Sequence, residues 1–440
     1  MDFTSLLRGL LGILVLITIA FVFSNNKRKI SWRLVGIGLA IQIVFAIFIF
    51  HGQTMGSWFA PLGWPKVCIE FFGTVVIKIL DFIAVGSKFV FSGLGAGPGQ
   101  PDSMGFFFAF QVLPTIIFFA SLTAVLYYLG ILQLIVKGMA WFMARLLGVS
   151  GAESLSNTAN IFIGQTEAPM LVRPFIGTMT QSELLTIMIG GMATVAGGVM
   201  ASYVQMLGIA LSQAQGISIA AAQGKFAVHL ITASVMAAPA SIVIAKILMP
   251  ETEVPKTMGT VKVEVPRDAS NVIEAAATGA SDGLQLALNV GGMLIVFIAF
   301  IAMFNFLLGA VGSLIGYPLS MQLILGWLLK YIAIGIGVPV QDAMNFGGLF
   351  GTKVVLNEFV AYIDLTTLIK SGAMTEKGIR MATFALCGFA NFSSIAIQLG
   401  GIAPMAPHRK KDIAALGLKS VLGGGLATLL TATLAGFLTA

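Results

Sequence analysis

Eight long apolar segments recur along this chain, and they limit its possible folds more than any other feature. A helix needs about 20 predominantly apolar residues to cross the hydrocarbon core of a bilayer, and these segments approach that length. They are Leu10–Phe23, Leu34–Phe50, Phe106–Leu129, Leu184–Leu207, Phe226–Met249, Leu284–Leu308, Met381–Ala403 and Ile413–Leu438. Only 10% of the residues are charged, against about a quarter in a typical soluble domain. The sequence therefore predicts an all-α polytopic membrane protein.

The basic residues indicate which side of the membrane each loop faces. A formal net charge of +7 could suggest a nucleic-acid partner, but Lys and Arg gather in short loops such as NNKRK (Asn25–Lys29) and HRKK (His408–Lys411). Short basic loops stay cytoplasmic, so we predict both loops inside, both chain ends outside, and no nucleic-acid partner. Arg8 is the only basic residue before the first apolar segment, which favours a retained helix over a cleaved signal peptide.

One long polar stretch, from Pro250 to Gly283, divides the chain into two halves. Ser270 opens its last part and Glu274 follows in the first turn, which is typical of a capped helix. We therefore predict five parts. They are N-terminal scaffold helices with an external or interfacial segment (1–130), a first repeat (131–249), a polar linker with an interfacial helix (250–283), a scaffold helix with its connection (284–330), and a second repeat (331–440).

The halves resemble each other in the order of their parts. An offset of 195 residues places Met179-Thr180 on Met374-Thr375 and leaves Glu167 about one helical turn from correspondence with Glu358. Counted from an external N-terminus, the helices that follow these pairs run in opposite directions. The pattern therefore favours an inverted repeat.

Each half also contains a segment that is too broken to cross the bilayer once. Asn160, Gly164 and Pro169 interrupt the first segment. The second is interrupted by Gly347, Gly348, Gly351, Lys353 and Asn357. We predict two oppositely oriented re-entrant hairpins, hairpin 1 at about 152–176 and hairpin 2 at about 338–366, since irregular backbone at membrane depth survives only where protein covers it or it lines a wet cavity.

Two glutamates, Glu167 and Glu358, lie in these apolar hairpins. An ionisable side chain near the bilayer centre costs roughly 2.5–3.5 kcal/mol, so we expect both at buried tips, each with a partner or a function. Ionised carboxylates only accept hydrogen bonds, and amides and hydroxyls stand nearby: Gln165, Thr166, Asn357, Asn391, Ser393 and Ser394. This set suits a neutral ligand with several donors. An anion would require an arginine cluster, whereas Arg173 and Lys353 are expected toward the open sides of their hairpins.

Gly197-Gly198, which follows Thr194-Val195, has two interpretations. Small residues allow close helix packing, or the helix unwinds here and its freed carbonyls hold a cation. The sequence contains no GxxxxGK[ST] phosphate loop. We therefore expect an ion gradient, rather than ATP, to drive any transport.

Three motifs resemble the signature stretches of the concentrative nucleoside transporter family. They are GQTEAP (Gly164–Pro169), NEFVAY (Asn357–Tyr362) and GFANFSSIAIQLGG (Gly388–Gly401). The resemblance implies eight transmembrane helices, two hairpins, an inverted repeat and broken helices at the binding site. It also implies a homotrimer in the bacterial inner membrane, with external termini and an elevator-type mechanism. The expected activity is sodium-coupled uptake of uridine-like nucleosides.

The resemblance also assigns roles to substrate-binding residues. The first motif implies that Gln165, Thr166 and Glu167 address the nucleobase, directly or through water. The second places Glu358 on the ribose hydroxyls. Of the remaining residues, Asn391 and Ser394 are implied beside the ribose, Phe389 against the ligand ring, and Val199 on the base.

A sodium site is implied at Asn160, Ile163, Thr194 and Val195. A serine is more familiar where Thr194 stands, but either hydroxyl can bind a hard cation. Proton coupling through Glu167 or Glu358 remains an alternative, as does another neutral polyhydroxylated solute. A polytopic membrane enzyme that uses the two glutamates as an acid/base pair lacks a nucleophile, a metal cluster and a cofactor loop, so we expect a transporter and not an enzyme.

Overall fold

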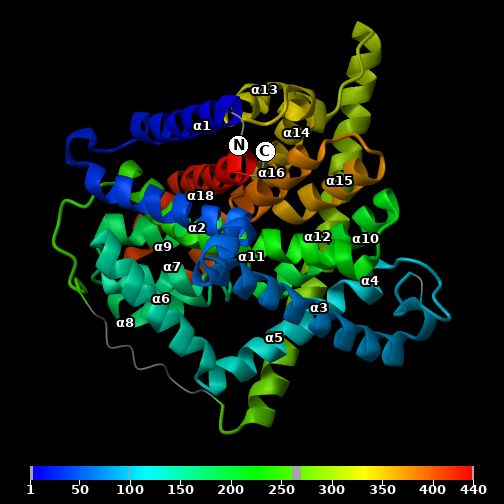
Figure 1. Ribbon diagram of the computed structural model, residues 1–440, viewed down its shortest axis with the longest axis horizontal. Helices are drawn as coiled ribbons and strands as arrows, with labels where there is room; N and C mark the ends of the chain where they lie inside the picture. The colour runs from blue at the N-terminus through cyan, green and yellow to red at the C-terminus, as the bar shows by residue number, and fades with distance from the viewer. Residues whose placement is uncertain (1–2, 99, 260–268, 439–440) are drawn as a thin grey trace.

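The computed structural model describes residues 3–98, 100–259 and 269–438, and this part of the chain is built almost entirely from helices (Figure 1). The first half contains α1 (Phe3–Val22), α2 (Trp32–Trp58), α3 (Trp64–Phe91), α4 (Phe108–Gln111), α5 (Leu113–Tyr128), α6 (Ile131–Leu147), α7 (Gly151–Ala159), α8 (Arg173–Ile176), α9 (Gln181–Ala193), α10 (Gly197–Gln215) and α11 (Ile219–Leu248). The second half contains α12 (Val272–Ile315), α13 (Met321–Gly335), α14 (Ala343–Val355), α15 (Glu358–Lys370), α16 (Glu376–Leu386), α17 (Phe392–Ile402) and α18 (Lys410–Leu438). The predicted all-α class is confirmed.

Six stretches of the described chain are helical, long and apolar enough to cross a membrane. They are Trp32–Trp58, Phe108–Tyr128, Gln181–Gln215, Ile219–Leu248, Val272–Leu314 and Pro407–Leu438, and each contains most of one predicted apolar segment. The other two predicted segments differ. Leu10–Phe23 lies on α1, whose apolar part, Leu6–Val22, is shorter, and Met381–Ala403 is divided between α16 and α17.

The two halves contain their elements in the same order. Thr180 caps the start of α9 and Thr375 caps the start of α16. Gly197 is the first residue of α10 and Phe392 is the first residue of α17. Both pairs are 195 residues apart, so the offset found in the sequence relates the starts of all four half-helices.

Each half contains one interrupted helix. We call the interruption between α9 and α10 the first break (Thr194–Ala196) and that between α16 and α17 the second break (Cys387–Asn391). Hairpin 1 consists of α7, the 3-10 helix η4 (Ala168–Val172) and α8, whereas hairpin 2 consists of α14 and α15.

The two interrupted helices run in opposite directions. α9 begins beside the start of α18, where Arg409 Nη1 donates to the carbonyl of Met179 at 2.6 Å. α16 begins near the other end of α18, where Gly436 packs directly against the side chain of Met381. The opposite directions of these two helices are those that the predicted inverted repeat requires.

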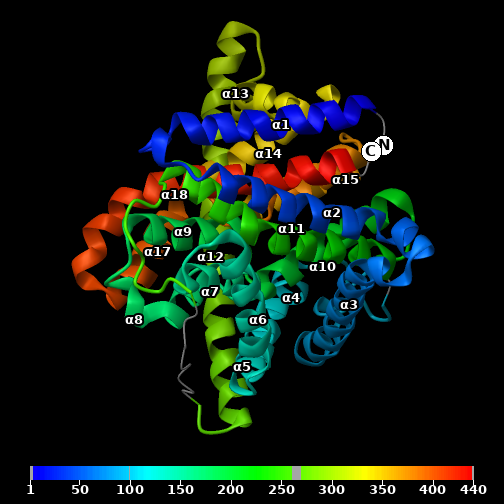
Figure 2. The ribbon, with the colours of Figure 1, turned by 60° about the vertical axis from the view of Figure 1, so that its left-hand side comes forward.

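The two basic loops share one face of the molecule. α1 and α18 lie side by side and antiparallel (Figures 1 and 2). At one end Gly9 packs against Phe437, and at the other Lys419 donates to the side chain of Asn25. The start of α1 and the end of α18 therefore lie on the face opposite the basic loops.

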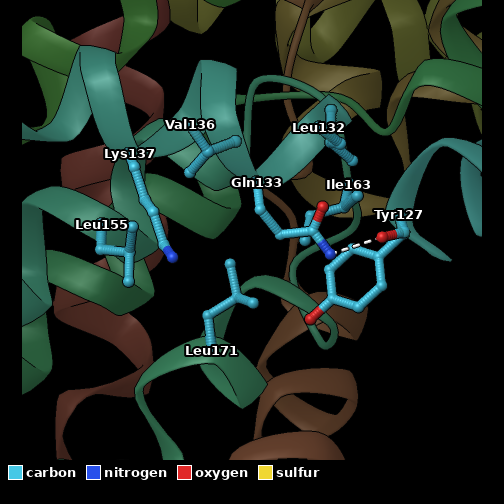
Figure 3. A pocket seen from close by; sticks show the side chains of 8 residues that line it. All are labelled: Tyr127, Leu132, Gln133, Val136, Lys137, Leu155, Ile163 and Leu171. Atoms are coloured by element: carbon cyan, nitrogen blue, oxygen red, sulfur yellow. Dashed lines mark hydrogen bonds between the residues drawn. The ribbon is translucent and has the colours of Figure 1, made fainter. Parts of the chain in front are cut away.

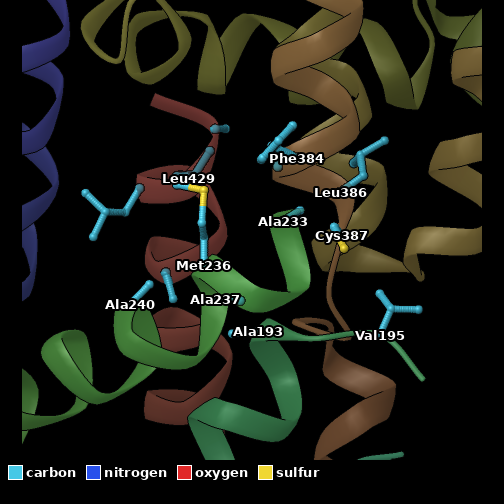
Figure 4. Close-up of a cluster of buried hydrophobic side chains, with 14 of the residues drawn as sticks. Ala193, Val195, Ala233, Met236, Ala237, Ala240, Phe384, Leu386, Cys387 and Leu429 are labelled. Atoms are coloured by element: carbon cyan, nitrogen blue, oxygen red, sulfur yellow. The ribbon is translucent and has the colours of Figure 1, made fainter. Parts of the chain in front are cut away.

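The second break touches the end of α9 at a glycine. Gly388 has a backbone φ of 156°, which residues other than glycine rarely adopt. A Cβ on Gly388 would lie 2.7 Å from the carbonyl oxygen of Met192, at the end of α9. α11 presents Ala233, Ala237 and Ala240 to this region (Figure 4), and such small side chains allow helices to approach closely.

The base of hairpin 1 is held by a buried ion pair that sequence reasoning did not find. Ser150 and Glu153 form a capping box at the start of α7, and Lys246 Nζ lies 2.7 Å from Glu153 Oε2. Lys246 also donates to the hydroxyl of Ser182 on α9 at 2.9 Å. These contacts join hairpin 1, α9 and α11 on the face of the basic loops.

α12 is the longest helix and is mostly exposed. Both of its ends project beyond the other helices (Figure 2), and it packs mainly on α5, where Gly279 and Gly283 lie against backbone atoms of Ala120 and Ile117. The expected cap at Ser270 is wrong by one residue: the side chain of Asn271 accepts from the amide of Glu274, because the amide of Ser270 instead donates to the Glu274 carboxylate.

We predict that Gly388→Ala lowers the free energy of unfolding by about 1–3 kcal/mol, the usual cost of forcing an extra group into a packed site. The new methyl would meet backbone atoms at the end of α9, which cannot move without disturbing the first break. Thermal unfolding in detergent measures the effect.

Gly400→Ala on α17 is the matched control, because no atom lies within 4 Å of its added Cβ and alanine favours helix over glycine. Equal stability of the two variants would contradict the contact between the second break and the end of α9.

Candidate functional site

Glu358 is the buried carboxylate around which the candidate site is built. It is the first residue of α15, at the turn of hairpin 2, and is 5% exposed. Tyr203 Oη donates to Glu358 Oε1 at 2.9 Å, and Asn391 Nδ2 donates to Glu358 Oε2 at 3.1 Å. Each carboxylate oxygen can accept two hydrogen bonds, so both oxygens retain an acceptor position for a further donor.

Asn391 connects this carboxylate to the second break. Its Oδ1 caps α17 by accepting from the amide of Ser394 at 2.8 Å, and it also accepts from the hydroxyl of Ser393 at 2.7 Å. One amide side chain therefore holds Glu358, through its nitrogen, and the start of α17, through its oxygen.

A chain of hydrogen bonds continues from α17 to hairpin 1. Gln165 Nε2 donates to the hydroxyl of Ser394 at 3.2 Å, and Gln398 Nε2 donates to Gln165 Oε1 at 3.1 Å. Gln398 Nε2 also donates to the carbonyl of Met188 on α9, at 2.9 Å. The buried site thus joins both hairpins and both interrupted helices.

The structure brings together four of the eight residues that the sequence implied for the substrate: Gln165, Glu358, Asn391 and Ser394. Val199 is buried in the first turn of α10, and Phe389 is half-buried in the second break. The methyl group of Thr166 packs against Gly401, and no hydrogen bond from its hydroxyl enters the network.

Glu167 differs from its prediction. We expected it at a buried tip, but it is exposed and its carboxylate lies over Gly164, where a Cβ would overlap it. The backbone accounts for this, since the 3-10 helix η4 begins directly after Glu167 and turns its side chain away from the network.

Lys353 also differs from its prediction. We expected it toward the open side of hairpin 2, but it is completely buried and donates to Ala385 and Thr428. Arg173 is exposed, as its expected position requires.

Sequence reasoning missed Tyr203 and Gln398, although helical spacing could have found both. Tyr203 follows Val199 by four residues on α10, and Gln398 follows Ser394 by four on α17. Residues four apart share one face of a helix, so each belongs beside a residue that had been selected. Tyr203 is fully buried, and its ring lies 4.2 Å from that of Tyr362.

The four residues that were implied around a cation are all buried where hairpin 1 meets the first break. The amide of Gly197 donates to the carbonyl of Phe162 at 3.2 Å, which holds the hairpin turn against the break. Asn160 Oδ1 is buried without a hydrogen-bond partner, and an unpaired buried acceptor is costly. A cation would satisfy it, so the donor set fits a hard ion.

A second cleft lies beside hairpin 1, against α6 (Figure 3). Most of its lining is apolar, from Leu132, Val136, Leu155, Ile163 and Leu171. The amide of Gln133 is directed at the carbonyl of Tyr127. Tyr127 and Lys137 complete the lining.

Three family models match successive parts of the chain. "Na+ dependent nucleoside transporter N-terminus" matches residues 11–94, "Nucleoside recognition" matches 109–210, and "Na+ dependent nucleoside transporter C-terminus" matches 229–436. Similar curated proteins include an uncharacterized transporter of Haemophilus influenzae, which is 45% identical over 98% of this chain and 97% of its own length. Nucleoside permease NupC of Helicobacter pylori is 39% identical over 99% of this chain and 98% of its own.

Solved structures resemble the whole fold. CNTnw in an inward-facing substrate-bound state is 40% identical, with a TM-score of 0.84 over 99% of this chain and 98% of its own. A variant of CNTnw in an outward-facing state is 40% identical, with a TM-score of 0.86 over 100% and 98%.

We predict that Tyr203→Phe lowers the free energy of unfolding by about 1.5–3 kcal/mol, the usual contribution of a hydrogen bond to a charged group. The variant keeps the ring contacts but leaves Glu358 Oε1 without its donor. Tyr331→Phe, on the exposed surface of α13, is the control. Thermal unfolding of both variants measures the difference. Equal stability of Tyr203→Phe and Tyr331→Phe would contradict a hydrogen bond from the Tyr203 hydroxyl to the carboxylate.

Proposed function

The chain belongs to the Na+-dependent, concentrative nucleoside transporter family, and on that premise we propose that it couples sodium entry to the uptake of uridine-like nucleosides. It is a nucleoside transporter and not an enzyme. The observation that carries the finer proposal is the buried hydrogen-bonded chain from Glu358 to Gln165.

A nucleoside offers this chain complementary groups. The ribose has neighbouring hydroxyl donors, and Glu358 retains acceptor positions on both oxygens. Asn391 and Ser394 lie beside that carboxylate, so they would contact the same sugar. Gln165 would address the base from within this network, and Thr166 and Glu167, whose side chains lie outside it, would reach the base through water. Val199 and Phe389 would supply apolar contacts to base and ring.

The oxygen ligands available near hairpin 1 favour sodium as the coupling ion, which would be transported together with the nucleoside. The unpaired Asn160 Oδ1 and the hydroxyl of Thr194 are neutral oxygens, and carbonyls of Ile163 and Val195 would complete the shell. One charge moving down about 100 mV supplies roughly 2.3 kcal/mol, enough for a few tens-fold accumulation at about 1.4 kcal/mol per tenfold.

The proposed transport cycle moves the substrate with the elements that bind it. Solved relatives exist in inward-facing and outward-facing states. Both hairpins and both interrupted helices are joined by the buried hydrogen bonds, which favours their motion as one body past the remaining helices, in the manner of an elevator. The substrate would then change sides while its contacts persist.

We place the face that carries the basic loops in the cytoplasm of a bacterial cell. The 3-10 helix η1 (Lys27–Lys29) and the start of α18 lie on that face, and short basic loops remain inside. The protein would then lie in the inner membrane, with the start of α1 and the end of α18 on its external side.

α12 supports the proposed homotrimer. It exposes large apolar side chains along its length, including Ile295, Phe304, Phe306 and Leu314. Lipid could cover all of them, but a helix that packs on one neighbour and projects at both ends can also bury a face against another copy.

We expect proteoliposomes containing this protein to accumulate labelled uridine when sodium is higher outside, because each turnover would bring in a cation with the nucleoside. An imposed proton gradient at the same potential should give no accumulation. Uptake driven only by protons would contradict the sodium site and favour proton coupling. Absence of uridine uptake under both gradients would favour another neutral polyhydroxylated solute.

Asn160→Leu tests the ion site within the same assay. It removes the unpaired oxygen and keeps the number and branching of the side-chain heavy atoms, so the sodium concentration for half-maximal uptake should rise by about tenfold or more, as expected for a lost charge–dipole contact. Asn305→Leu, outside the site between α12 and α13, is the control and should leave the sodium dependence unchanged.

We also expect the detergent-solubilised protein to have the mass of three chains by light scattering, because the apolar side of α12 would be buried between copies. Replacement of Phe304 and Phe306 by serine should shift the mass toward one chain. A monomeric wild-type protein with full nucleoside binding would contradict the trimer.

A further inference from the structure

Lys353 carries a positive charge into the interior of hairpin 2. It is 0% exposed, and its Nζ donates to the carbonyl of Ala385 at 2.8 Å and to the hydroxyl of Thr428 at 3.0 Å. Among the residues that the structure describes, no carboxylate lies within ion-pair distance of this ammonium. Burying an ammonium beyond ion-pair distance of any carboxylate is expensive, so its position calls for a compensating role.

Its main acceptor lies at the end of an interrupted helix. Ala385 belongs to the last turn of α16, directly before the second break. The last four carbonyls of a helix lack partners within it and carry the negative end of its dipole. Tyr362, also in hairpin 2, donates to the carbonyl of Thr383 at 2.8 Å in the same turn. Hairpin 2 therefore binds this helix end with one hydroxyl and one cation.

The first repeat has a different group at the matching place. The offset of 195 residues relates Ala385 to Gly190, whose carbonyl accepts from the hydroxyl of Thr194 at 2.9 Å. Thr194 is one of the residues proposed around the sodium ion. The ends of α9 and α16 thus match in position. The hydroxyl of Thr194 contacts the carbonyl of Gly190, whereas the ammonium of Lys353 contacts the carbonyl of Ala385.

The second repeat also lacks the other side-chain oxygen of the sodium site. The same offset places Phe389 where Thr194 stands, and the alignment of Glu167 with Glu358 in the hairpins places Gly351 where Asn160 stands. Neither residue has a side chain that can bind a hard cation. Among the side chains of the described residues, the cation that contacts the end of α16 is Lys353, which is covalently attached to α14.

We propose that Lys353 is a tethered cation that serves the second repeat as the sodium ion serves the first. The inference rests on the sodium site proposed above. The ammonium holds the end of α16 against hairpin 2, and thereby positions Asn391 and Glu358, which flank the second break and the hairpin turn. Only the first repeat then requires a mobile ion, so each nucleoside is bound with a single sodium. Lys353 is a positioning residue and does not contact the substrate.

The test compares Lys353→Met, which removes both charge and donors, with Lys353→Gln, which keeps an amide donor and loses the charge. Lys370→Met, at the exposed end of α15, is the matched control. The purified proteins are titrated with uridine at saturating sodium and with sodium at fixed uridine, and their thermal stabilities in detergent are measured.

We expect both Lys353 variants to bind uridine about tenfold or more weakly, the scale of a buried helix-end charge, while their thermal stability is unchanged or higher because an unpaired buried charge has been removed. A purely structural lysine would lower stability and affinity together. Wild type and the control should bind sodium with a Hill coefficient close to one, as a single coupled site requires.

Unchanged uridine affinity in Lys353→Met would overturn the proposal. Unchanged affinity in Lys353→Gln would overturn the role of the charge, and this variant decides the question if Lys353→Met fails to fold. A wild-type Hill coefficient near two would overturn the single-ion inference. Failure of the proposed function looks different, because the wild-type protein itself would then bind uridine independently of sodium.

Discussion

The contact between the second break and the end of α9 is the constraint on which the rest of the structure depends. Backbone groups at membrane depth must be hydrogen-bonded within the protein, yet each interrupted helix releases carbonyls at its broken end. The structure meets this cost with side chains from elsewhere in the fold. At the end of α16, Lys353 and Tyr362 of hairpin 2 donate to the carbonyls of Ala385 and Thr383. Gly388 permits both broken ends to meet at one point, because any Cβ there would overlap the end of α9.

The binding site follows from this solution. The residues that satisfy the breaks are polar, buried and rigid, which is the environment that a hydrogen-bonding solute requires. Asn391 serves both purposes: its side-chain oxygen caps α17 and its side-chain nitrogen donates to Glu358. Because the same hydrogen bonds join the interrupted helices and shape the candidate site, the proposed recognition of the substrate and the fold of both halves depend on one network. This coupling favours movement of the whole network as a unit over independent movement of its residues.

Much of this architecture could be predicted from the sequence, because apolar length and helix breakers are local signals. The motifs led to Gln165, Glu358, Asn391 and Ser394, which do meet. The errors have a common physical origin, since burial depends on packing between distant elements. Glu167 lies one residue before a 3-10 turn that directs it outward, whereas Lys353, which resembles a surface residue in the sequence, is enclosed by α16 and α18. Neither environment can be read from neighbouring residues.

The inverted repeat also explains why two similar backbones can perform different tasks. Duplication supplies two broken helices with equivalent negative ends, and each end needs positive charge or donors nearby. On the proposal above, a mobile ion at one end would make binding depend on a gradient, whereas a fixed ammonium at the other would position that half when no ion is present. If both ends required mobile ions, the empty site would lose its order at both breaks together. On this proposal, an asymmetric pair would keep hairpin 2 and Glu358 in position, and sodium binding at hairpin 1 would complete the site for the nucleoside.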